Sequence, residues 1–126
     1  MTATIQVTSH KDIVTKIETD TLFEYGDSKV MKKELEASKK DYEIEKKRIC
    51  EGLEDCDNDY SYTIESIGKT RIKVTTAMNL EGAMTKKDGL NVLFHTKNYN
   101  KGDYVSYEKY IGNLASMGYV KQQQEK

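Results

Sequence analysis

The segment from Ser28 to about Leu53 constrains the fold most, because it is rich in helix-favouring residues and carries apolar residues on two separate faces. At about 100° per residue, these fall on two stripes roughly 140° or more apart. The first stripe contains Met31, Leu35, Tyr42, Ile49 and Leu53, and the second contains Val30, Ala37 and Ile44. A helix that lies on a sheet buries one stripe. The second stripe must therefore meet another part of the chain, another subunit or water.

The sequence leaves two interpretations of the second stripe open. In the first, it covers residues 10–25 of the same chain. In the second, it forms part of a homodimer seam along helix 28–53 or of a groove that binds another protein. The small side chain of Ala37 at its centre would allow a close approach. The candidate partner-binding residues are Val30, Glu34, Ala37, Lys40, Asp41 and Ile44.

The region before the helix contains one clear strand and one ambiguous segment. Apolar residues alternate with polar ones over residues 3–7, which predicts a half-buried strand. In residues 10–25, Ile13, Val14 and Ile17 would share one helical face, but apolar residues and threonines also occupy the odd positions, as in a strand. Of these two, we predict a short helix over residues 10–18 that leads into an extended piece.

The region after the helix has the alternation of a β-structure. An acidic turn over residues 54–59 leads into a predicted hairpin over residues 59–77. Asp88-Gly89 is typical of a second hairpin turn, because both residues tolerate positive φ. The apolar run Leu90–Phe94 then predicts a central strand. Residues 80–87, before the turn, predict at most an irregular edge strand.

The C-terminal part predicts a short helix over residues 107–117. Ser106 can cap its start, and Gly118 supplies a left-handed stop, after which Tyr119 packs back onto Leu114. Residues 121–126 are expected to be a disordered tail. We therefore predict a single α+β domain over residues 1–120, in which a small antiparallel sheet of three to five strands is covered by the long helix, with the short helix at one end.

Composition excludes some partners. The 20 basic and 21 acidic residues nearly cancel, so the overall field gives no reason to seek nucleic acid or an anionic membrane. No apolar run approaches the length of a membrane span, and residues 1–11 lack the pattern of a secretory signal. We expect a cytoplasmic protein with no membrane association. The excess of lysine over arginine is common in small proteins of phages and mobile elements.

A local basic patch is the alternative route to nucleic acid. Lys69, Arg71 and Lys73 lie in the predicted hairpin together with Tyr60 and Tyr62, and single-strand binders combine cations with aromatic rings in this way. Alternation argues against it, because it places the tyrosines on the buried face and Arg71 and Lys73 on the outer one. A nucleic-acid-associated regulator is therefore the second hypothesis.

Metal and phosphate motifs are incomplete. Cys50 and Cys56 have the wrong spacing for a zinc ribbon or a redox pair, and we expect both thiols to be reduced. The spacing of Asp55, Asp57 and Asp59 is that of a calcium loop, but the glycine and the bidentate glutamate are missing. Gly68-Lys69-Thr70 matches the last three residues of a P-loop. The first glycine of that motif and the helix that should follow it are missing. We predict no metal and no cofactor.

The sequence also gives no catalytic arrangement. His10 and His95 are the only histidines, and the sequence indicates no nucleophile or carboxylate partner for either. We expect His95 at a strand edge. We therefore predict a non-catalytic protein that binds another protein as a regulator, an inhibitor or an assembly accessory. A small enzyme without a recognisable motif is the third hypothesis.

Overall fold

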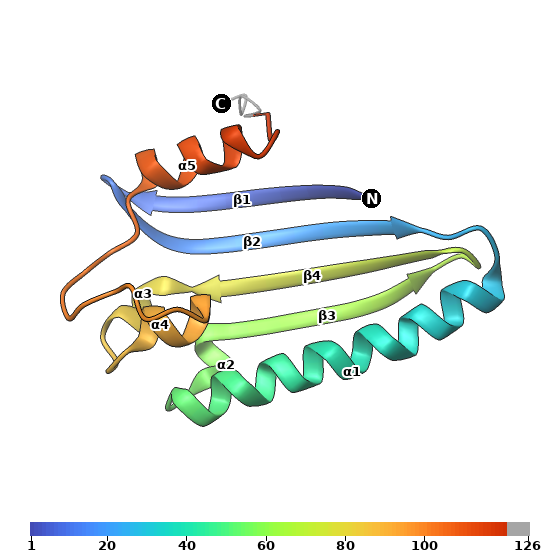
Figure 1. Cartoon of the computed structure of the whole chain (residues 1–126), viewed down its shortest axis with the longest axis horizontal. Coiled ribbons are helices and arrows are strands. Elements are labelled where there is room, and N and C mark those ends of the chain that lie inside the picture. The colour runs from blue at the N-terminus through green and yellow to red at the C-terminus, as the bar shows by residue number, and fades with distance from the viewer. Residues whose placement is uncertain (121–126) are drawn as a thin grey trace.

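The computed structural model describes residues 1–120, which form an α+β fold around one four-stranded antiparallel sheet (Figure 1). The strands are β1 (Thr2–His10), β2 (Ile13–Glu24), β3 (Tyr60–Ile67) and β4 (Arg71–Asn79). Their order in the sheet is β1-β2-β4-β3. The prediction of a small antiparallel sheet with one long and one C-terminal helix is confirmed.

The long helix α1 (Ser28–Gly52) lies along β3 and β4. The Asp27 carboxylate accepts a 2.9 Å hydrogen bond from the Val30 amide and caps its start. Met31 and Ile49 are buried. Leu35 and Tyr42 are partly buried and pack against the cluster that contains Ile72 and Val74. The first apolar stripe therefore faces the sheet, as its spacing predicts.

The main hydrophobic core lies at one end of the sheet. Ile49 and Tyr60 meet there with two short helices, α3 (Leu80–Met84) and α4 (Gly89–Phe94), and with Val105 from the following loop. A smaller cluster of Met31, Ile72 and Val74 lies under the first turns of α1.

The predicted helix over residues 10–18 is wrong. These residues belong to the first hairpin, in which Ile17 pairs with Val7 on β1 and with Met78 on β4. A register shift between Thr8 and Ser9 brings Val14 into the core although it lies at an even position. The β-branched residues of this segment favour the strand, and pairing on both sides of β2 decides the outcome.

The predicted strands over residues 80–87 and Leu90–Phe94 are also wrong. Asp88 does have positive φ (55°), but it precedes α4 instead of closing a hairpin. Gly89 is needed for close packing, since a Cβ there would lie 1.8 Å from the Ala83 carbonyl oxygen. A short apolar run fits a buried helix as well as a buried strand. His95 accordingly ends α4 with φ 51° and does not lie at a strand edge.

The C-terminal helix α5 (Tyr107–Ser116) has the predicted caps. The Ser106 hydroxyl accepts a 3.4 Å hydrogen bond from the Lys109 amide. Gly118 has φ 95°, and the Tyr119 amide donates to the Leu114 carbonyl at 3.1 Å, which completes a Schellman motif. The predicted tail over residues 121–126 lies outside the described residues. Among residues 1–120, no helix combines the length and the hydropathy needed to cross a membrane.

Candidate functional site

The outer edge of β1 is open to pairing. Within residues 1–120, β1 pairs only with β2, and its nine residues contain no Lys, Asp, Glu or Pro. Natural sheets usually block a free edge with such residues or cover it. At the opposite edge of the sheet, a side chain of α1 contacts the strand backbone: Lys46 donates a hydrogen bond to the Tyr60 carbonyl of β3. The unprotected β1 edge is therefore the one that can accept a further strand.

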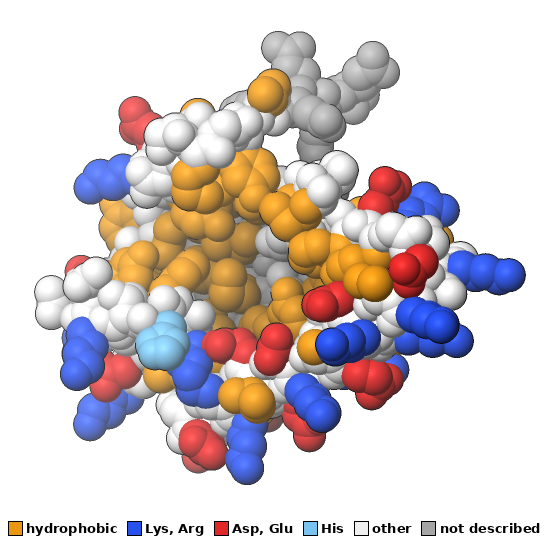
Figure 2. Space-filling model, turned by 45° about the vertical axis from the view of Figure 1, so that its right-hand side comes forward, with side chains coloured by type: hydrophobic (Ala, Val, Ile, Leu, Met, Phe, Trp, Pro, Cys, Tyr) orange, Lys and Arg blue, Asp and Glu red, His pale blue; other side chains and the backbone are white. Residues whose placement is uncertain are grey.

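A groove separates this edge from α5. Its volume is about 1320 Å³, and one wall is formed by residues 1–9. The other wall is the apolar side of α5, which presents Tyr107, Ile111, Leu114 and Ala115. No residue of α5 is buried, and Met117 at its end is 66% exposed. Figure 2 shows hydrophobic side chains lining a hollow in one face of the molecule.

Among the described residues, the side chains that line the groove carry no charge. Every residue that lines it is apolar, a glycine, or a neutral polar residue such as Thr4 and Gln6. The apolar residues Ile5 and Val7 of β1 pack against the same core cluster as Tyr107 and Tyr110 of α5. The groove therefore combines apolar side chains of β1 and α5 with polar groups of the β1 edge.

Hydrogen bonds at one end hold α5 in place. The Asp12 carboxylate, in the turn after β1, accepts a 2.7 Å bond from the Ser106 hydroxyl and a 3.0 Å bond from the Glu108 amide. These two bonds, with a smaller contribution from the Lys109 charge, lower the pKa of Asp12 below its usual value. These bonds fix the N-terminus of α5, whereas Met117 near its other end is exposed.

The predicted partner-binding residues of α1 lie on its outer face. Val30 is 45% exposed and Ile44 is 68% exposed, and Ala37 is exposed between them. The interpretation that this stripe covers residues 10–25 is therefore wrong. Charged side chains interrupt the stripe, since Glu34, Lys40 and Asp41 are exposed along it. A partner or a homodimer seam on this face stays a prediction.

Two residues of the predicted basic patch have glutamates opposite them in the sheet. Arg71 and Lys73 lie on β4, directly opposite Glu24 of β2 and Glu65 of β3 respectively, and Lys69 lies in the turn between β3 and β4. The tyrosines are on the other face of the sheet, where Tyr60 is buried and the Tyr62 ring lies 5.4 Å from that of Tyr42. Cations and rings therefore do not form one surface, and nothing here favours the nucleic-acid hypothesis.

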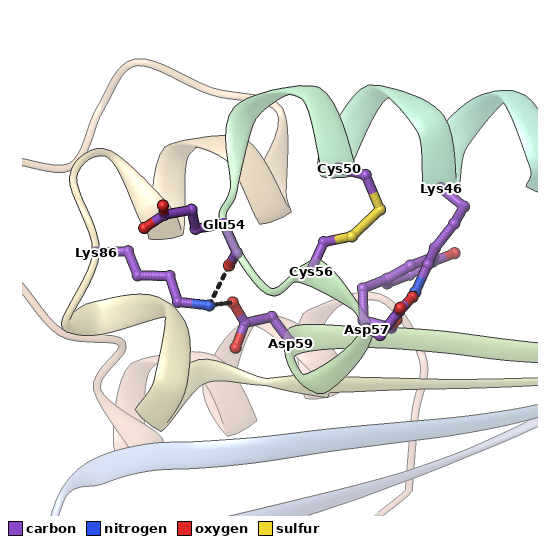
Figure 3. The surroundings of a disulfide bond; sticks show 8 residues. Lys46, Cys50, Glu54, Cys56, Asp57, Asp59 and Lys86 are labelled. Atoms are coloured by element: carbon purple, nitrogen blue, oxygen red, sulfur yellow. Dashed lines mark hydrogen bonds and ion pairs between the residues drawn. A yellow bond between two sulfur atoms is a disulfide. The ribbon is translucent and has the colours of Figure 1, made fainter.

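The expectation of reduced thiols is wrong. Cys50 and Cys56 form a disulfide between the last turn of α1 and the short helix α2 (Cys56–Asp59) (Figure 3). The chain folds back after Gly52, and this brings their Cα atoms within 5.0 Å. Disulfides persist mainly in oxidising compartments. A cytoplasmic location stays a prediction, and this bond counts against it.

The acidic turn is held by lysines. Asp57 pairs with Lys46 at 2.9 Å, while Asp59, only 1% exposed, pairs with Lys86 at 2.5 Å. Lys86 also donates to the Glu54 carbonyl (Figure 3). Donor atoms of Cys50, Cys56 and Asp57 lie within 4.8 Å of one another, but the two sulfurs are joined in the disulfide. The carboxylates of Asp57 and Asp59 therefore act as structural partners of lysines.

Comparison with models of protein families, with curated proteins and with solved structures finds no match for this chain. The groove is therefore interpreted from its own geometry and chemistry. Its residues were missed in the sequence because Ile5, Ile111 and Leu114 have the ordinary spacing of core residues. The available signal was the absence of charged residues from residues 2–9 in a chain that is 33% charged.

Proposed function

We propose that this protein is a non-catalytic binder of another protein, and that the groove between β1 and α5 receives an extended segment of that partner. The observation that carries the proposal is the edge of β1, which lies beside the apolar side of α5, a helix with no buried residue. In β-augmentation, an extended segment joins a sheet edge by main-chain hydrogen bonds while pockets receive its alternate side chains. Such a binder serves as a regulator, an inhibitor or an assembly accessory.

The chemistry of the groove favours a polypeptide over a small apolar molecule. One wall contains the backbone N–H and C=O groups of a strand that has a partner on only one side. An apolar ligand would cover these groups without pairing them, at a cost in free energy. An extended polypeptide would pair them. The volume of about 1320 Å³ also exceeds the usual 300–1,000 Å³ of small-molecule sites.

The outer stripe of α1 is the weaker candidate for the partner site. Val30, Ala37 and Ile44 offer three apolar side chains without a concave surface, and charged residues separate them. Exposed apolar residues that stand singly are normal on protein surfaces. We therefore place the partner in the groove and keep the α1 stripe as a separate hypothesis for self-association.

Selection from a random peptide library on the immobilised protein tests the proposal. Leu114→Lys places a charge in the groove, and Asn113→Lys places the same charge on an exposed, adjacent position of α5 that does not line the groove. No α5 residue is buried, so both variants should fold, which circular dichroism can check.

We expect peptides that bind the wild type and Asn113→Lys but bind Leu114→Lys at least tenfold more weakly. Failure to enrich any peptide, or equal binding to both variants, would contradict a partner site in the groove.

A further inference from the structure

We infer that the bound segment is an uncharged β-strand of alternating apolar and polar residues, with three apolar side chains beneath α5. This inference rests on the proposed function and names the chemistry of the partner. Three features of the groove lead to it: its length, the alternation imposed by the sheet, and the neutral side chains that line it.

The length of α5 sets the number of side chains that it can cover. Its ten residues span about 15 Å at 1.5 Å per residue. A strand advances about 3.3 Å per residue, so α5 covers four to five residues of a strand that runs beside β1. Three of five consecutive residues point to one side. The nine residues of β1 allow pairing to continue beyond the helix.

The sheet imposes alternation on the added strand. Its side chains would lie level with those of β1, where Ala3, Ile5 and Val7 are partly buried and the residues between them are exposed. Residues level with Ile5 and Val7 would face Ile111 and Leu114 of α5. Residues level with Thr4 and Gln6 would face water. The preferred segment is therefore apolar at every second position and polar between.

The lining excludes charge from the covered positions. Within residues 1–120, no side chain that lines the groove is charged, so a buried Lys or Glu of the partner would find no counter-ion among these side chains. Burying an unpaired charge is costly, and this cost would select neutral residues. Charged residues are tolerated only beyond the end of α5.

The position of α5 favours a single strand over the edge of another sheet. In Figure 1, α5 runs alongside β1 on the side away from β2. A second copy that paired through its own β1 would bring its β2 into the space that α5 occupies. A lone extended segment needs only the groove. Because residues 2–9 themselves alternate without charge, self-association is still the main competing outcome of a test.

The test compares two soluble peptides of the same composition, with Val at alternate positions (Thr-Val-Thr-Val-Thr-Val-Thr) or in one block (Thr-Thr-Val-Val-Val-Thr-Thr). A third peptide has Lys in place of the central Val of the alternating one. Binding to the full chain is measured by fluorescence anisotropy, and the oligomeric state by light scattering. Leu114→Lys and Asn113→Lys again serve as the variant and its matched control.

We expect the alternating peptide to bind at least tenfold more tightly than the blocked and Lys peptides, and to lose this affinity only in Leu114→Lys. If the alternating and blocked peptides bind equally and both lose affinity in Leu114→Lys, the inference is overturned. The groove would then still be a protein-binding site. Equal binding unaffected by Leu114→Lys would overturn both. A dimer that dissociates in Leu114→Lys, without peptide binding, would identify a second copy as the occupant and overturn the inference.

Discussion

The Asp12 carboxylate accepts a hydrogen bond of 2.7 Å from the hydroxyl of Ser106, a residue 94 positions later in the chain. The Tyr107 amide donates to the Asp12 carbonyl at 2.7 Å, so the same residue holds α5 through main chain and side chain. Together with the packing of Tyr107 and Tyr110 against the core, these bonds at the N-terminus of α5 hold the helix beside β1. The width of the groove therefore depends on Asp12.

Acid should loosen α5. Hydrogen bonds from Ser106 and the Glu108 amide lower the pKa of Asp12, so its stabilising contribution is complete above the unfolded-state pKa of about 3.9 and is lost as pH falls through the folded-state pKa. We expect the Glu108 amide resonance in NMR spectra to shift as the carboxyl is protonated, and Asp12→Asn to show the shifted position at neutral pH. Asp20→Asn, on exposed β-strand surface, is the control. An unchanged Glu108 resonance in Asp12→Asn would show that the carboxylate does not hold α5.

Lys86→Met should destabilise the protein strongly. The change leaves the buried Asp59 without its cation, and breaking one partner of a buried ion pair costs about 3–5 kcal/mol. Urea unfolding measures this loss. Lys87→Met, at an exposed neighbouring position, should change the free energy of unfolding by less than about 0.5 kcal/mol. Similar effects of the two variants would mean that the pair does not form in solution.

Removing the disulfide should cost less. Cys50 and Cys56 are separated by 6 positions, and closing so short a loop stabilises a folded chain by about 2 kcal/mol in the chain-entropy model. We expect the double variant Cys50→Ser/Cys56→Ser to lose this amount in urea unfolding, and the wild type in a reductant to lose a comparable amount. A wild type whose unfolding midpoint is insensitive to reductant would indicate that the bond is absent from the purified protein.

Alkali should destabilise the protein through Tyr60. Burial raises the pKa of Tyr60 to about 12, with smaller contributions from Tyr42 and Glu45. A raised folded-state pKa means that the stabilising contribution is complete below pH 10 and is lost as pH rises from about 10 to 12. Tyr60→Phe should reduce this loss, whereas Tyr104→Phe, at a position 49% exposed, should not. Unfolding curves from pH 9 to 12 provide the comparison, and identical alkaline losses in both variants would exclude Tyr60 as the cause.

Long periodic segments and the alternating strand over residues 3–7 were predictable from the sequence, whereas residues 10–18 and 80–94 were not. Helices 28–53 and 107–117 and the hairpin over residues 59–77 repeat their patterns long enough to select one secondary structure. Ile13, Val14 and Ile17 fit both periods, and only pairing of β2 with β1 and β4 decides between them. The run Leu90–Phe94 is ambiguous for the same reason.

The candidate site depends on relationships that no single segment contains. The edge of β1 is free because the strand order is β1-β2-β4-β3, and local alternation does not determine that order. The groove also needs α5 to return to β1 through Asp12 and Ser106. Likewise, the disulfide requires the fold of α2 against the end of α1. The sequence predicts a docking surface on α1, whose length makes its pattern most visible, and that prediction stays untested beside the proposed groove.

Hydrogen exchange of the full chain with and without the alternating peptide tests the account most directly. If the peptide joins the sheet, main-chain amides of β1 that face the groove become protected, together with amides of α5, while α1 exchanges as before. Protection confined to the outer face of α1, or bound peptide with unchanged exchange in residues 2–9, would contradict the addition of a strand to β1.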